Sequence, residues 1–128
     1  MTILVIINKP VIDLTVRDKN LNQMYKDADY PKISLDTKQA ASGRTESSNI
    51  TLGRLAFKSY RHLYLALGHE FIHAYHNFTG DYMYWVKNFG EKRAIYNTER
   101  GAYSWIQSYD APSLRYKWEA EFRQRYSN

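Results

Sequence analysis

The chain has 128 residues, of which 44% are hydrophobic, and a formal net charge of +5. A chain of this length usually forms one domain with its own core. It contains no cysteine, which excludes disulfide bonds and every zinc site with a cysteine ligand, so a bound metal would need His, Asp or Glu ligands. We expect a single domain over residues 1–128, strand-rich over residues 1–57 and helical over residues 58–128.

Charge and hydropathy indicate neither a membrane protein nor a typical nucleic-acid-binding protein. The apolar run at residues 3–7 is too short to span a membrane, and no basic residue precedes it as in a signal peptide. Lys and Arg are scattered, so the positive charge and the 12 tyrosines indicate an anionic partner only weakly. We expect no membrane partner, do not expect nucleic acid, and expect a protein that stays in the cytoplasm or is delivered by a dedicated export system.

The first thirty residues contain two segments rich in β-favouring residues. Thr2–Asn8 is one of them, and Pro10 would end it. Residues 11–16 have similar content and could pair back on it. Residues 20–30 are mostly polar and predict a short helix or a turn.

Two further strands are expected before the helical part. Residues 32–36 and 50–57 alternate between apolar and polar positions, as half-buried strands do. Between them, residues 37–49 are rich in Ser, Thr, Ala and Gly, which predicts a mobile loop.

After Lys58 the apolar period becomes helical. Ser59 is a suitable N-cap and Gly80 a suitable C-cap, so we expect a helix over residues 60–78. Five apolar residues at a spacing of three or four would form one face of this helix: Tyr64, Leu67, Phe71, Tyr75 and Phe78.

The remaining chain predicts two more helices. Residues 81–90 form an aromatic connector, and residues 91–109 form the second helix, which Asp110-Ala-Pro would stop. A third helix would begin near Ser113 and run to the end.

The first long helix carries the residues that indicate a function. His69 and His73 are four residues apart, which on a helix is one turn, about 6 Å along the axis, so both imidazoles can bind one zinc ion. Glu70 lies between them and points about 100° away. It can therefore act as a general base on a zinc-activated water rather than as a ligand.

The segment His69-Glu70-Phe71-Ile72-His73 resembles the signature of the zincin metallopeptidases. The resemblance implies an α+β fold in which a small mixed or antiparallel sheet precedes the active-site helix and two further helices follow. It also implies an edge strand that pairs with an extended peptide substrate. We expect residues 50–57 to be that strand, and residues 37–49 to cover or flank the cleft.

A catalytic zinc site needs a third protein ligand. The metzincin branch of the family would have Gly and His at the positions of His76 and Thr79, so that branch is excluded. Glu99 lies 26 residues past His73, on the predicted inward stripe of the second helix, where a carboxylate without a cation would be costly. The segment Glu99-Arg100-Gly101-Ala102 also resembles the Glu-x-x-Ala helix of small gluzincins, a group with bacterial effector, toxin and compact cytoplasmic peptidases.

Other residues stay open as third ligands. Glu91 follows Gly90 at a predicted helix start, where the helix dipole alone favours an acidic residue. Asp81 is expected to serve a turn, and His76 extends the row of histidines along the helix.

Two further roles lack a firm candidate. Tyr103, one turn from Glu99, is our choice for the donor that stabilises the developing oxyanion, and Tyr96 is the alternative. The Ser and Asp that follow the ligand Glu in thermolysin-like enzymes are absent, which leaves the hydrogen-bond partner of His69 unidentified.

The sequence thus predicts a zinc metallopeptidase that hydrolyses a peptide or protein substrate. The ligands would be His69, His73 and Glu99, with Glu70 as general base and Tyr103 as oxyanion donor. The alternatives are a non-catalytic zinc-binding or peptide-binding module on a zincin fold, and a basic nucleic-acid-binding domain.

Overall fold

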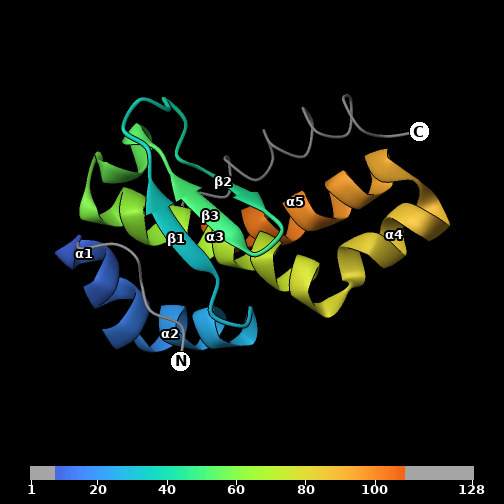
Figure 1. Cartoon of the computed structure of the whole chain (residues 1–128), viewed down its shortest axis with the longest axis horizontal. Helices are drawn as coiled ribbons and strands as arrows, with labels where there is room; N and C mark the ends of the chain where they lie inside the picture. Colours follow the sequence, from blue (N-terminus) through green and yellow to red (C-terminus); the bar gives the residue numbers. More distant parts are fainter. Residues whose placement is uncertain (1–7, 109–128) are drawn as a thin grey trace.

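The computed structural model describes residues 8–108, which form an α+β fold of helices around a small mixed sheet (Figure 1). Of the strand predicted at Thr2–Asn8 only Asn8 is described, and the helix predicted from Ser113 lies outside the described residues. The elements in chain order are α1 (Lys9–Ile12), the π-helix η1 (Asp13–Arg17), α2 (Lys19–Asp27), β1 (Lys32–Leu35), β2 (Gly43–Glu46), β3 (Asn49–Leu52), the 3-10 helix η2 (Arg54–Phe57), α3 (Tyr60–Thr79), α4 (Asp81–Phe89) and α5 (Glu91–Gln107).

The sheet has the strand order β1-β3-β2, with β1 parallel and β2 antiparallel to β3. The prediction of an edge strand at residues 50–57 is wrong, because β3 ends at Leu52 and lies in the middle of the sheet. The edge strand that contacts α3 is β2, which lies inside the segment predicted to be a loop. The sequence did not predict β2, because a strand with little apolar content gives no alternating pattern.

The start of the described chain is helical, so the predicted strand at residues 11–16 is wrong. The Asn8 side chain caps α1 by accepting a hydrogen bond from the backbone N–H of Val11, and Pro10 occupies the first turn. Both are helix-start signals that outweigh the β-preference of the Val and Ile residues. Val11, Leu14 and Leu21 are buried, which places one face of this N-terminal helical part in the core.

Helix α3 begins and ends where the sequence predicted. The Ser59 hydroxyl accepts a hydrogen bond from the backbone N–H of His62, and Gly80 ends the helix with a φ of 85°. Leu67 and Phe71 of the predicted apolar stripe are fully buried, but Tyr75 and Phe78 are 40% and 57% exposed. The predicted stripe is therefore buried only over its earlier part.

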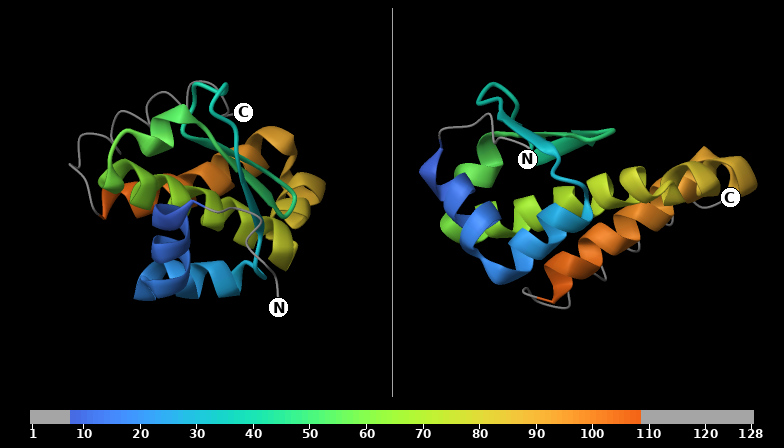
Figure 2. Two further views of the ribbon diagram at one scale, coloured as in Figure 1. Left: turned by 60° about the vertical axis from the view of Figure 1, so that its left-hand side comes forward. Right: turned by 60° about the horizontal axis from the view of Figure 1, so that its bottom comes forward.

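Residues 81–89 form helix α4 rather than the predicted connector. Gly80 and Gly90 bound the helix, and Asp81 in its first turn interacts favourably with the helix dipole. None of its residues is fully buried, so the sequence has no apolar period that would predict this helix. The helix packs against α5 and α3 (Figure 2).

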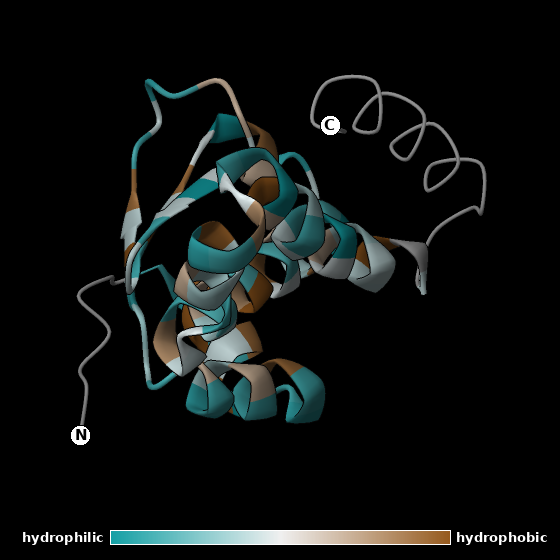
Figure 3. Ribbon diagram, turned by 90° about the vertical axis from the view of Figure 1, so that its right-hand side faces the viewer, coloured by the Kyte–Doolittle hydropathy of each residue, from teal (hydrophilic) through white to brown (hydrophobic). Residues whose placement is uncertain are grey.

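Helix α3 is the central element, with the sheet and α5 packed on different sides of it and α2 beneath (Figures 1 and 2). Apolar residues are interspersed with polar ones along the helices and strands, as in amphipathic elements that share a core (Figure 3). Over residues 8–108, no helix combines the length and hydropathy needed to cross a membrane.

Candidate metal centre

A cleft of about 970 Å³ runs along α3, with β2 and α5 as its walls and α4 at one end. Residues 41–45 and Ser47 line the β2 side. The prediction that the segment at residues 37–49 flanks a cleft is confirmed for this part, although the segment contains a strand. The hairpin is tied to α3, because the side-chain amide of Asn77 donates to the backbone carbonyl of Ser47 at 2.9 Å.

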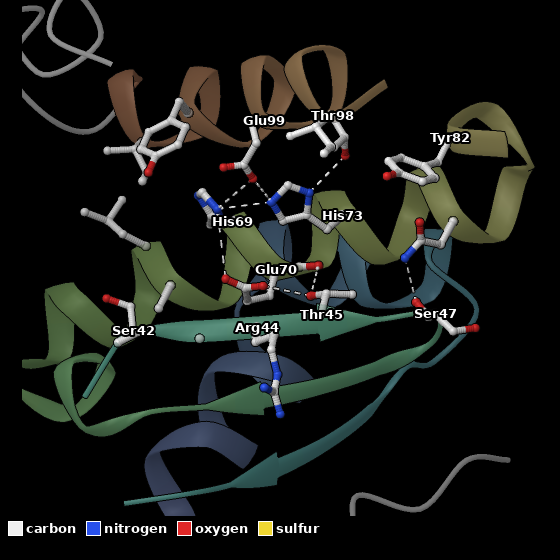
Figure 4. A pocket seen from close by; sticks show the side chains of 18 of the residues that line it. Ser42, Arg44, Thr45, Ser47, His69, Glu70, His73, Tyr82, Thr98 and Glu99 are labelled. Carbon is white, nitrogen blue, oxygen red and sulfur yellow. Dashed lines mark hydrogen bonds and ion pairs between the residues drawn. The ribbon is translucent and has the colours of Figure 1, made fainter. Parts of the chain in front are cut away.

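His69, His73 and Glu99 come together on the floor of this cleft (Figure 4). The Nε2 atoms of the two histidines are 3.2 Å apart. Glu99 Oε1 contacts His73 Nε2 and lies 3.6 Å from His69 Nε2. Two ligands of a tetrahedral zinc ion, each at about 2.1 Å, would be about 3.4 Å apart. The two nitrogens therefore fit a single ion, and the donor set of two imidazoles and a carboxylate suits zinc.

The environment keeps Glu99 ionised. Burial alone would raise its pKa, but hydrogen bonds and charge interactions with His69 and His73 outweigh burial and lower the pKa from 4.5 to about 2. The carboxylate is therefore negative at neutral pH, as a metal ligand must be.

The other residues considered as third ligands lie apart. Among residues 8–108, His69, His73 and Glu99 are the group whose donor atoms lie close enough together to share an ion. Glu91 and Asp81 are exposed on α5 and α4. His76 has its Nδ1 atom 2.9 Å from the hydroxyl of Thr98.

The Glu70 side chain lies between α3 and β2, beside the candidate ligand group of His69, His73 and Glu99. Its side chain is only 6% exposed, and its Oε2 atom is 4.0 Å from His69 Nε2. The hydroxyl of Thr45 on β2 donates to Glu70 Oε1 at 2.8 Å. A Cβ atom at Gly43 would lie 3.1 Å from Glu70 Oε2, so the glycine gives the carboxylate room. Glu70 thus borders the cleft without belonging to the ligand group.

The tyrosines proposed as oxyanion donors lie in different places. The ring of Tyr103 packs edge-on against the ring of His69, with centroids 4.9 Å apart, and Tyr103 lines the cleft. Tyr96 is buried and does not line it. Tyr82, which the sequence interpretation placed in a connector, extends from α4 into the cleft near His73 (Figure 4). No sequence pattern marks Tyr82 among 12 tyrosines.

Thr98 is a site residue that the sequence interpretation missed. Its hydroxyl lies 2.9 Å from His73 Nδ1 and 2.9 Å from His76 Nδ1. Thr98 is buried on the same face of α5 as Ala94 and Ala102, four residues away on either side. A polar residue between two buried alanines was the sequence signal that could have indicated its role. His69 Nδ1, in contrast, is buried and has no hydrogen-bond partner within the described part of the chain.

Close contact between α3 and α5 holds the ligands at this spacing. The indole N–H of Trp105 donates to the backbone carbonyl of Leu65 at 3.1 Å. A Cβ atom at Gly68 would lie only 2.0 Å from the indole ring. Gly68 therefore allows the close approach of α5.

Comparison with known proteins gives no relative. The chain matches no protein-family model, and no curated protein or solved structure matches it.

Proposed function

We propose that the protein is a zinc metallopeptidase of the zincin type, with a gluzincin ligand set. The observation that carries this proposal is the convergence of His69 and His73 with Glu99, which comes from a helix 26 residues further along the chain. Glu70 stands next to this group, on the side where β2 forms the cleft wall. A carboxylate beside three potential zinc ligands in a cleft is the arrangement that hydrolysis by a zinc-activated water requires.

The proposed chemistry divides into metal and protein roles. A bound zinc ion would supply a Lewis acid that polarises the scissile carbonyl and makes a water more acidic. Glu70 would take the proton of the attacking water and pass it to the leaving amine. The hydrogen bond from Thr45 occupies Glu70 Oε1, which leaves Oε2, the oxygen nearer His69, for proton transfer.

The outer edge of β2 would hold the substrate. The backbone N–H of Gly53 donates to the carbonyl of Ser42, so Ser42 and then Arg44 and Glu46 are the residues hydrogen-bonded to β3. The backbone groups of Gly43 and Thr45 therefore point away from β3. Among the described residues, β2 has a neighbouring strand on the β3 side alone. An extended peptide that adds to this edge would use Gly43 and Thr45.

A non-catalytic binding module with the same ligands is the second candidate. It would share the zinc affinity and the peptide-binding edge but show no hydrolysis. The presence of Glu70 beside the ligand group favours the enzyme, because a binding module needs no general base.

The deciding experiment measures zinc content and zinc affinity in the wild type, His73→Ala and Glu99→Ala. We expect one zinc ion per chain in the wild type and a large loss of affinity in both variants. His62→Ala is the matched control, since His62 is an exposed histidine of α3 at the edge of the cleft, and it should keep the ion. A wild type that binds no zinc would overturn the proposal, and a Glu99→Ala variant with full affinity would remove Glu99 from the site.

A further inference from the structure

Three side chains form a hydrogen-bonded row that begins in the candidate ligand group: His73, Thr98 and His76. Both histidines direct Nδ1 at the same hydroxyl, each at 2.9 Å. We propose that Thr98 and His76 are positioning residues that hold His73 in the tautomer in which Nε2 can bind the metal. The inference rests on the proposed function, because it assigns a role around the proposed zinc ligands.

The hydrogen-bond capacity of the Thr98 hydroxyl decides which group donates and which accepts in this row. A threonine hydroxyl carries one proton and two lone pairs. If His73 Nε2 binds a metal, the ring proton of the neutral imidazole sits on Nδ1 and must be donated to Thr98 Oγ1. The proton of Thr98 is then free to be donated to Nδ1 of His76. All three groups are satisfied only if His76 carries its own proton on Nε2.

The surroundings of His76 suit a neutral acceptor. Burial lowers the pKa of His76 and the nearby His73 lowers it further, while Asp81 opposes this shift, and the net lowering favours the neutral ring. The ring of Trp85 packs edge-on against it at 5.0 Å. A Cβ atom at Gly101 would lie 3.1 Å from its Cε1 atom, so α5 also contacts it closely. These contacts fix the ring and keep its Nδ1 atom on Thr98.

The two ligand histidines are held differently. His69 Nδ1 has no hydrogen-bond partner over residues 8–108, and its ring packs edge-on against Tyr103 instead. The hydrogen-bonded support of the ligand group therefore rests on His73. Loss of the Thr98 hydroxyl should weaken metal binding, because the His73 ring would lose its fixed tautomer and orientation.

The first test is zinc affinity, measured by competition with a chromophoric chelator. Thr98→Val keeps the shape of the side chain but removes the hydroxyl, and we expect it to bind zinc about 10–100-fold more weakly than the wild type. Thr98→Ser restores the hydroxyl and should restore most of the affinity. Thr51→Val is the matched control, because this hydroxyl contacts Ser34 within the sheet and does not line the cleft, and it should bind zinc as the wild type does.

Circular dichroism and urea unfolding of the zinc-free variants check that the fold is retained. The inference is wrong, while the zinc site stands, if three results occur together. The wild type binds zinc, His73→Ala abolishes this binding, and Thr98→Val binds zinc as tightly as the wild type. If the wild type binds no zinc, the proposed function itself fails.

The second test needs no activity. Nitrogen-15 NMR of the imidazole rings in the zinc-loaded protein reports which nitrogen carries the proton. We expect the proton of His73 on Nδ1 and the proton of His76 on Nε2. A proton on Nδ1 of His76 would contradict the proposed direction and overturn the inference.

Discussion

Glu70 is the residue whose surroundings best separate catalysis from metal binding. Its carboxylate accepts a hydrogen bond from Thr45 and lies outside the ligand group. Glu70→Gln keeps the shape and the acceptor oxygen but removes the base. We expect peptide hydrolysis to fall by about 10²–10⁴-fold, with zinc content unchanged.

The measurement is hydrolysis of a peptide library by the wild type and by Glu70→Gln, each loaded with zinc. Equal hydrolysis by both proteins would mean that Glu70 is not the base. No hydrolysis of any peptide by a wild type that does bind zinc would favour the binding-module alternative.

Gly68 controls the contact between α3 and α5. A Cβ atom there would lie 2.0 Å from the ring of Trp105, so Gly68→Ala should overpack this contact at a cost of about 1–3 kcal/mol. The better helix propensity of Ala offsets about 1 kcal/mol of that cost. We expect a net loss in the free energy of unfolding, measured by urea denaturation.

The cause of this loss can be isolated in a second background. In Trp105→Ala the ring is gone, so adding Gly68→Ala should be neutral or stabilising by up to about 1 kcal/mol. If Gly68→Ala destabilises both backgrounds equally, the contact with Trp105 is not the reason for the glycine.

At the scale of the element, two glycines that bound α4 have different backbone requirements. Gly80 has φ 85° and ψ 0°, and Gly90 has φ 90° and ψ 162°. No atom lies within 4 Å of a Cβ built at either position, so the cost of a substitution is conformational. Asn enters the first region readily, whereas the second is accessible almost only to glycine.

We therefore expect Gly80→Asn to be nearly neutral and Gly90→Asn to lower the free energy of unfolding by about 1–3 kcal/mol. Urea denaturation of the two variants provides the comparison. Equal effects at both positions would contradict the assignment of these backbone conformations.

At the scale of the whole molecule, the ligand group connects α3 to α5. His69 and His73 come from α3 and Glu99 comes from α5, so an ion bound by all three would crosslink the two helices and stabilise the folded state. Zinc at about 100 times its dissociation constant should add about 2.7 kcal/mol to the free energy of unfolding. A chelator should lower the melting temperature reversibly, and His73→Ala should show no response to zinc or chelator.

The sequence by itself determined the parts of the site that depend on local geometry. The spacing of His69 and His73 fixes their shared face once a helix forms, and Ser59 and Gly80 define that helix. Glu99 was predicted from its place on an inward stripe, and the structure brings it to the two histidines. The α+β class was implied by the resemblance to zincins and is the class of the structure, although residues 9–27 are helical rather than strand-rich.

Only the tertiary structure decided the rest. The polar strand β2 exists because it pairs with β3 and is tied to α3 by Thr45 and Asn77, and none of these contacts leaves an apolar period in the sequence. The role of Thr98 depends on two histidines that lie 22 and 25 residues away in sequence. Local patterns report burial and backbone preference, whereas partners distant in the chain are selected by packing.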